Sequence, residues 1–244
     1  MVSALPAAIV SGLLLVGAAQ AETVSVAVAA NFIKAAEDLQ PIFAAKTGHQ
    51  VAYSFGATGL LYAQAMQGAP FDVLLAGDDM RPAQAVADGI GVEGTVFTYA
   101  IGALALNSIS LDVRDGEAVL KQGDFDKLAI ADPQTAPYGR AAVETLAALG
   151  LLDELTPLLV TGENISQTLQ FIESGNAELG FVAASQVLGR PGVWLVPGDL
   201  HEPIRQDAVL LKAGEANPAA LAFMDFLKSD AAVAVIQAAG YEVE

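Results

Sequence analysis

The stretch TVSVAVAANFIKAAEDLQPIFAAKTG, residues 23–48, sets the fold class of this chain. Its first part, Thr23 to Ala29, consists of Thr, Val, Ser and Ala and predicts a buried strand. From Phe32 to Lys46 the apolar residues recur at helical spacing, and Thr47-Gly48 supplies a helix stop. Pro41 lies inside this pattern, so we expect a kink there. A strand followed directly by a helix is the repeating unit of an α/β fold.

The same alternation continues along the rest of the chain. Further strands are predicted at Val51–Ser54, Asp72–Ala76, Ile101–Leu106, Lys127–Ala131, Leu158–Val160, Leu179–Val182 and Ala208–Lys212. Further helices are predicted at Gly59–Met66, Arg81–Asp88, Gly139–Leu149, Ser166–Glu173, Pro218–Leu227 and Ala231–Ala239. A second block begins near Ala100, and the two halves share an architecture rather than a sequence. The pattern therefore predicts an α/β protein without internal sequence repeats.

Residues 1–21 have the features of a secretory signal peptide. An apolar run from Ala7 to Val16 is followed by Ala19-Gln20-Ala21, the small-x-small pattern of a signal-peptidase site. We therefore expect cleavage after Ala21 and export of a mature chain that begins at Glu22. The usual Lys or Arg near the start is missing, so an uncleaved membrane helix is the alternative, although the run is barely long enough to span a bilayer.

Composition narrows the classes of function. The 244 residues can form one large domain or two smaller ones, and 54% hydrophobic residues allow a substantial core. Without cysteine, disulfides, thiol catalysis and cysteine-ligated metals are excluded. A net charge of −17 argues against nucleic acid or an anionic membrane as a partner. Because fields of exposed charges fade within about 8 Å at physiological salt, a buried set of local donors can still bind an anion.

Signatures of enzymes are scarce. The chain has no dinucleotide-binding, phosphate-loop or nucleophile-elbow motif. His49 and His201 stand alone and fit surface turns. Asp78-Asp79 follows a predicted strand, where two carboxylates could do acid–base work or bind a cation, but capping of the next helix is the favoured interpretation. A secreted hydrolase or transferase that uses Asp78, Asp79 or His201 is the alternative from another class.

Four strand-to-helix corners carry small or hydroxyl-bearing residues. They are Ala29-Ala30-Asn31, Gly56-Ala57-Thr58-Gly59, Pro137-Tyr138-Gly139 and Glu163-Asn164-Ile165. In an open α/β sheet such corners lie at the carboxyl ends of strands, where ligands bind. A helix N-terminus has unpaired N–H groups and a partial charge of about +0.5. Each corner alone fits an ordinary cap or turn, whereas several that converge would form an anion site without Lys or Arg.

Six segments, in this order and spacing, resemble the periplasmic molybdate-binding proteins of ABC transporters, the ModA family. They are AVAANF (27–32), SFGATGLLYAQ (54–64), GAPFDVLLAGD (68–78), ADPQTAPYG (131–139), GENISQTLQFIESGNAELGFV (162–182) and AVLLK (208–212). The resemblance covers essentially the whole chain after the signal segment. It implies a protein that captures molybdate or tungstate in a cleft and delivers it to a membrane permease, with no cofactor and no catalysis, as a monomer.

The resemblance also implies a type II periplasmic binding protein fold, in which two α/β lobes joined by two crossing strands close over the ligand. The crossings are expected near Ile101–Leu106 and Pro203–Ala208. The first lobe then comprises residues 22–101 plus 208–244, and the second comprises residues 102–207.

Carried over residue by residue, the oxyanion contacts of the family fall on five positions. They are Ala30 through its N–H, Asn31 through its N–H and side-chain amide, Thr58 through its hydroxyl and N–H, Tyr138 through its N–H, and Ile165 through its N–H. Asn31 stands where many members have serine. Ala183 stands where some members have a tyrosine whose hydroxyl reaches the ion, so we expect that contact to be missing.

The chemistry of the ligand agrees with such a site. Molybdate and tungstate are tetrahedral dianions, so their oxygens need hydrogen-bond donors only. A set of donors should reject a phosphate that carries a proton, because its O–H would face another donor. Sulfate has the same charge and shorter bonds, so its exclusion depends on the size of the pocket. Binding of sulfate, thiosulfate or another small anion, or a ligand-sensing role for a receptor, are the alternatives on the same fold.

Overall fold

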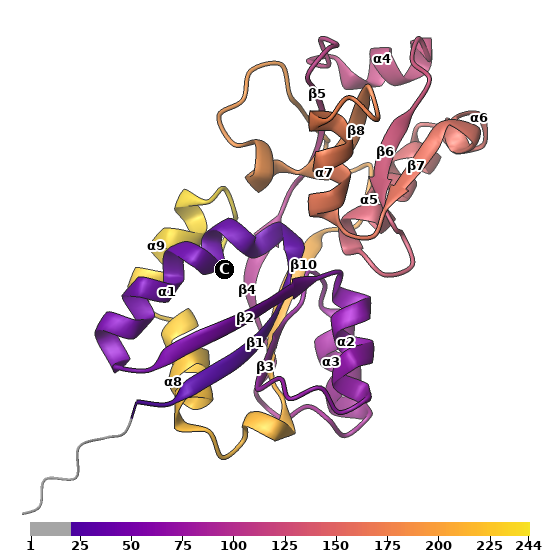
Figure 1. Ribbon diagram of the computed structural model, residues 1–244. Coiled ribbons are helices and arrows are strands. Elements are labelled where there is room, and N and C mark those ends of the chain that lie inside the picture. The colour runs from indigo at the N-terminus through magenta and orange to yellow at the C-terminus, as the bar shows by residue number, and fades with distance from the viewer. Residues whose placement is uncertain (1–20) are drawn as a thin grey trace, which may run out of the picture.

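The computed structural model describes residues 21–244, so the predicted signal peptide, apart from Ala21, lies outside the described residues. Two α/β units lie one above the other in Figure 1, each built on its own five-stranded sheet. Each sheet with its helices is called a lobe below. No helix within the described range is long and apolar enough to cross a bilayer.

The first sheet has the strand order β2-β1-β3-β10-β4. Its strands are β1 (Thr23–Ala29), β2 (Gln50–Gly56), β3 (Val73–Leu75), β4 (Phe97–Gly102) and β10 (Ile204–Leu210). β1 pairs in parallel with β2 and β3, whereas β10 is antiparallel to β3 and β4. The central strands therefore point their carboxyl ends the same way, towards the other lobe (Figure 1).

The second sheet has the order β7-β6-β8-β5-β9. Its strands are β5 (Leu104–Ser108), β6 (Leu128–Ala131), β7 (Leu159–Gly162), β8 (Leu179–Ala183) and β9 (Trp194–Leu195). β6 is parallel to β7 and β8, and β5 is antiparallel to β8 and β9. Each sheet therefore contains both parallel and antiparallel pairs of strands.

Helices cover both sheets. Those of the first lobe are α1 (Ile33–Thr47), α2 (Thr58–Met66), α3 (Met80–Ala87), α8 (Pro218–Leu227) and α9 (Asp230–Ala238). Those of the second are α4 (Gly116–Gln122), α5 (Pro137–Ala148), α6 (Leu152–Leu155) and α7 (Ile165–Glu173). Short 3₁₀ turns occur at η1 (Ala30–Phe32), η2 (Thr156–Leu158), η3 (Ala184–Val187) and η4 (Lys212–Gly214).

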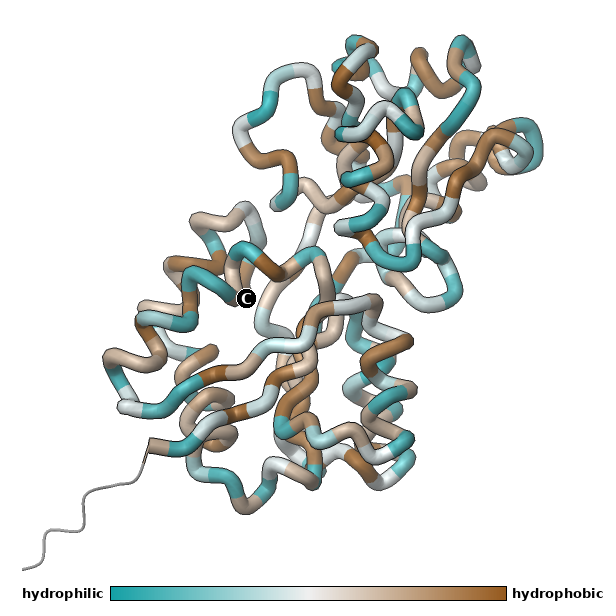
Figure 2. Tube along the Cα trace, viewed as in Figure 1, coloured by the Kyte–Doolittle hydropathy of each residue, from teal (hydrophilic) through white to brown (hydrophobic). Residues whose placement is uncertain are grey.

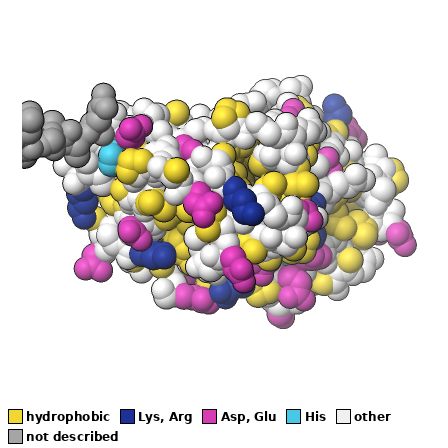
Figure 3. Space-filling model, turned by 90° about the horizontal axis from the view of Figure 1, so that it is seen from below, with side chains coloured by type: hydrophobic (Ala, Val, Ile, Leu, Met, Phe, Trp, Pro, Cys, Tyr) yellow, Lys and Arg dark blue, Asp and Glu magenta, His cyan; other side chains and the backbone are white. Residues whose placement is uncertain are grey.

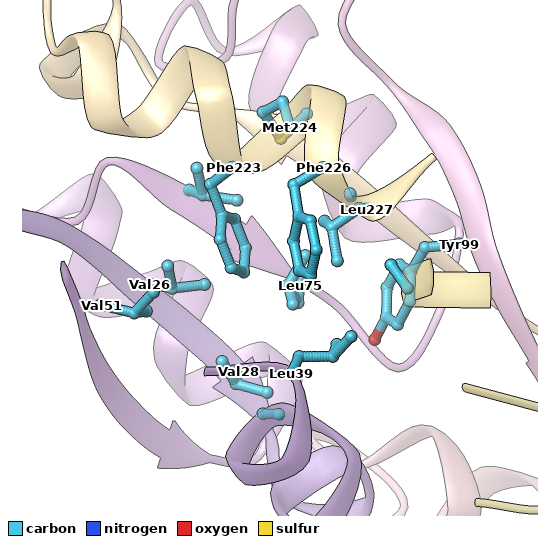
Figure 4. Packing of buried hydrophobic residues seen from close by; sticks show 14 of the residues in the cluster. Val26, Val28, Leu39, Val51, Leu75, Tyr99, Phe223, Met224, Phe226 and Leu227 are labelled. Carbon is cyan, nitrogen blue, oxygen red and sulfur yellow. The ribbon is translucent and has the colours of Figure 1, made fainter. Parts of the chain in front are cut away.

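Helices cover both faces of the first sheet, and alternate residues of β1 therefore belong to two different cores. Val26 belongs to the core formed with α1, α8 and α9, whereas Ala27 belongs to the core formed with α2 and α3. Figure 4 shows Phe223 of α8 pointing towards the strands that carry Val26 and Leu75. Figure 2 shows hydrophobic residues along the strands and hydrophilic residues in many outer loops. A strand covered by helices on both faces is apolar at successive residues, and β1 is so from Val26 to Ala29.

Most predicted elements are found, and the differences have physical causes. The predicted strand Ile101–Leu106 is the end of β4 and the start of β5, separated by Ala103, because the chain passes from one sheet to the other there. The predicted strand Ala208–Lys212 begins earlier, at Ile204, since polar residues at its start hid the strand pattern. α4, α6 and β9 were not predicted from the sequence. α1 continues through Pro41 to Thr47, and the expected kink stays a prediction.

Shortening the side chain of Phe223 should destabilise the first lobe. The residue is fully buried, and its ring lies 5.3 Å from the ring of Phe43 in an edge-on arrangement. We expect Phe223→Ala to lower the free energy of unfolding, measured by urea titration, by about 3–5 kcal/mol, because it leaves a cavity. Leu221→Ala on the same helix is the control, since Leu221 is 46% exposed. Equal losses in the two variants would contradict this account of the core.

Candidate functional site

A small cavity lies between the lobes where four strand-to-helix corners meet. It is lined by Ala29, Ala30, Asn31, Gly56, Ala57, Thr58, Ala136, Pro137, Tyr138, Asn164 and Ile165. All five residues predicted to contact an oxyanion are in this set. Each is buried, with exposed fractions between 1% for Thr58 and 6% for Asn31. The structure therefore brings the predicted site residues together from both lobes.

The cavity is formed by chain segments that leave a strand and enter a helix. In the first lobe, β1 ends at Ala29 before η1, and β2 ends at Gly56 before α2. In the second lobe, β6 leads to α5 and β7 leads to α7, whose first turn is capped by Asn164. The side-chain oxygen of Asn164 accepts hydrogen bonds from the backbone N–H groups of Ser166 and Gln167, at 3.0 and 3.1 Å. The N-termini of α2, α5 and α7, which carry partial positive charge, therefore all lie at the cavity.

Glycine allows the corners to approach one another. The N–H of Gly59 donates to the carbonyl oxygen of Thr135 in the other lobe at 2.8 Å. A Cβ atom on Gly59 would lie only 3.1 Å from the Cα of Thr135. A Cβ on Gly139 would lie 2.1 Å from the carbonyl oxygen of Ala131, so the first turn of α5 packs directly on the end of β6. Side chains at these positions would push the corners apart.

The cavity is lined by backbone donors that have no partner. Among the hydrogen bonds formed within residues 21–244, none has the N–H of Ala30, Asn31, Thr58, Tyr138 or Ile165 as donor. N–H groups in the first turn of a helix have no acceptor inside that helix. Neighbouring N–H groups are paired, as Gly139 is with Ala136 at 3.0 Å. Because an unpaired buried donor is unfavourable, the arrangement favours a ligand that only accepts hydrogen bonds.

Two side chains at the site differ in what they offer the cavity. The hydroxyl oxygen of Thr58 accepts a hydrogen bond from the N–H of Gly77 at 2.9 Å, which leaves its own hydrogen available to a ligand. The side-chain nitrogen of Asn31 donates to Gln206 at 2.8 Å and to the hydroxyl of Tyr241 at 3.1 Å. Both hydrogens of the Asn31 amide are therefore engaged, so the donor that Asn31 offers the cavity is its backbone N–H.

No Asp, Glu, Lys, Arg or His is among the described residues that line the cavity. The surface is different: in Figure 3, acidic side chains are spread over the face seen from below, in keeping with the net charge of −17. Nor does the described part of the chain contain a group of three His, Asp or Glu side chains that could hold a metal ion. The cavity is thus neutral in side-chain charge, and helix N-termini supply its positive potential.

The residues considered for catalysis lie away from the cavity lining. Asp78 is buried, which raises the pKa of its carboxyl, and its Oδ1 accepts from the N–H of Arg81 at 3.0 Å at the start of α3. Asp78 thus serves the start of α3, in line with the favoured interpretation, while Asp79 is exposed. His49 Nδ1 accepts from the N–H of Glu22 at 3.1 Å. His201 Nδ1 lies 2.7 Å from the carbonyl oxygen of Glu202.

Ala183, the last residue of β8, is buried and is not among the residues that line the cavity. Its N–H donates to the side chain of Gln186 at 3.1 Å. Three residues that support the site from behind were not predicted from the sequence: Ser185, Gln206 and Tyr241. None of the three carried a local signal in the sequence: Gln206, for example, lies between Arg205 and Asp207, and its full burial becomes evident only in the fold.

Comparison with known proteins agrees with this geometry. Residues 24–242 match the model of a family described as bacterial extracellular solute-binding protein. The molybdate-binding protein ModA of Rhodobacter capsulatus is 50% identical over 240 residues, covering 97% of this chain and 94% of the relative. That of Azotobacter vinelandii is 52% identical over 238 residues, covering 95% and 94%.

A solved structure shows the same fold. The periplasmic molybdate-binding protein of Azotobacter vinelandii superposes with a TM-score of 0.86 at 38% identity, covering 91% of this chain and 99% of that chain. The predicted α/β fold class with two lobes is therefore confirmed. The chain belongs to the family of bacterial extracellular solute-binding proteins.

Proposed function

We propose that this protein binds molybdate or tungstate in the cavity between its lobes and delivers the anion to the permease of an ABC transporter. The observation that carries the proposal is the convergence of five unpaired backbone N–H groups, from four corners, on one buried cavity without charged side chains. The relatives that share half of its residues are molybdate-binding proteins by name, which supports the choice of ligand. The protein is a binding protein and not an enzyme.

The donors suit a tetrahedral dianion. Each oxygen of molybdate can accept from N–H groups or from the Thr58 hydroxyl, and each hydrogen bond to a charged group contributes about 1.5–3 kcal/mol. The donors come from α2 in one lobe and from α5 and α7 in the other, so the anion neutralises several helix N-termini at once. Binding to donors from both lobes favours the closed arrangement over an open one.

The lobe boundaries belong to the same proposal. Because β4 ends at Gly102 and β10 begins at Ile204, both in the first sheet, the boundaries expected from the sequence shift slightly: the first lobe comprises residues 22–102 plus 204–244, and the second comprises residues 103–203. The connections after β4 and before β10 act as the hinge. The single residue between β4 and β5 supports a hinge at that position. We further propose a monomer that is exported to the periplasm after cleavage behind Ala21, in agreement with the extracellular family to which it belongs.

Ligand-dependent thermal stability tests the proposed function. We expect molybdate and tungstate to raise the melting temperature of the mature protein, whereas sulfate and phosphate leave it unchanged. A ligand at 100 times its dissociation constant adds about 2.7 kcal/mol to the stability. Equal stabilisation by sulfate would overturn the choice of ligand, and no effect of any oxyanion would overturn the binding function. The measurement is differential scanning fluorimetry against a sodium chloride control.

Replacing Ile165 by proline removes one donor without disturbing the helix. Ile165 is the first residue of α7, where proline is well tolerated, and Asn164 before it has an extended backbone with φ −148° and ψ 173°. We expect Ile165→Pro to weaken molybdate binding by about 10- to 100-fold, measured by isothermal titration calorimetry.

The matched control is Ile165→Ala, which shortens the side chain and keeps the N–H. A proline variant that is folded and binds as tightly as the alanine variant would show that this N–H does not contact the anion.

A further inference from the structure

Behind the cavity, buried side chains hold the loop that carries Ala30 and Asn31. Gln206 in β10 is fully buried and is central to this network. Its oxygen accepts from the side-chain nitrogen of Asn31 at 2.8 Å and from the hydroxyl of Tyr99 at 3.2 Å. Its nitrogen donates to the hydroxyl of Tyr138, in the other lobe, at 3.2 Å. One amide thus joins the side chains of two residues whose N–H groups face the cavity.

Tyr241, which follows α9, holds Asn31 at two points. Its hydroxyl donates to the carbonyl oxygen of Asn31 at 2.8 Å and accepts from the Asn31 amide at 3.1 Å. Burial raises the pKa of Tyr241 to about 12, so the hydroxyl keeps its hydrogen at neutral pH. Asn31 is therefore fixed through both its side chain and its backbone.

The second lobe reaches the same loop with two serine hydroxyls. Ser185, in η3, lies 2.9 Å from the hydroxyl of Tyr241 and 3.4 Å from the carbonyl oxygen of Asn31. Ser166, in α7, donates to the carbonyl oxygen of Ala30 at 3.2 Å. In a trans peptide the carbonyl and the next N–H point in opposite directions. A bond from Ser166 to Ala30 therefore helps aim the N–H of Asn31.

We propose that Ser185 and Tyr241 form a latch between the lobes that positions Asn31 and slows the release of the bound anion. The two hydroxyls belong to different lobes, so their contact exists only while the lobes are together. Neither residue lines the cavity, so both act through Asn31 and are positioning residues. This inference rests on the proposed function, because it concerns the lifetime of the complex with the anion.

Release kinetics test the latch. The protein is loaded with ⁹⁹Mo-molybdate, and the bound label is followed after addition of excess unlabelled molybdate. We expect Ser185→Ala to release the label about 3- to 10-fold faster than the wild type, the effect of losing one hydrogen bond. Tyr241→Phe should release it at least as fast, because that hydroxyl contacts both Asn31 and Ser185. The association rate should be unchanged, and so should the ligand-free melting temperature of Ser185→Ala. Ser185→Thr restores a hydroxyl and should restore slow release.

Tyr53→Phe is the control, because it also removes a buried tyrosine hydroxyl of the first lobe, one with no hydrogen-bond partner in the described part of the chain. It should release the label at the wild-type rate. Wild-type release from Ser185→Ala, or a loss of affinity confined to the association rate, would overturn the latch. Failure of the wild type to retain the label would instead overturn the proposed function.

Discussion

The N–H groups in the first turn of a helix cannot be paired within that helix, and the arrangement of this protein depends on that constraint. Elsewhere in the molecule such groups find caps: the side chain of Asp115 accepts from an N–H at the start of α4, and that of Ser229 does so at the start of α9. At the cavity they are left for a ligand, and the chain buries them between two lobes. Donors of this kind need no charged side chain, which explains how a strongly acidic protein can present a site for an anion.

Much of this arrangement could be predicted from the sequence. The strand and helix periods are clear from Thr23 to Gly48, and the corners contain residues that fit tight turns. Because carboxyl ends of parallel strands meet at one edge of a sheet, such corners could be expected to converge. The resemblance to a known family then selected five residues, and the structure gathers all five around one cavity.

Other features could not be predicted, because they depend on contacts between distant segments. Nothing local in the sequence indicates that Tyr241 lies beside Asn31, 210 positions away. The side chain of Asn31 was expected to face the ion, yet Gln206 and Tyr241 take up both hydrogens of its amide. The break between β4 and β5 was also hidden, since an apolar strand looks the same whether it stays in one sheet or crosses to the next.

The neutral lining of the cavity has a consequence for proton balance. The N–H groups and the threonine hydroxyl that face it do not titrate at ordinary pH, and burial raises the pKa of the Tyr138 hydroxyl well above its usual value. No donor has to gain or lose a proton when a dianion enters. Capture and release therefore need no exchange of protons between these groups and the solvent. The pH of the solvent limits binding only where it is low enough to protonate the anion itself.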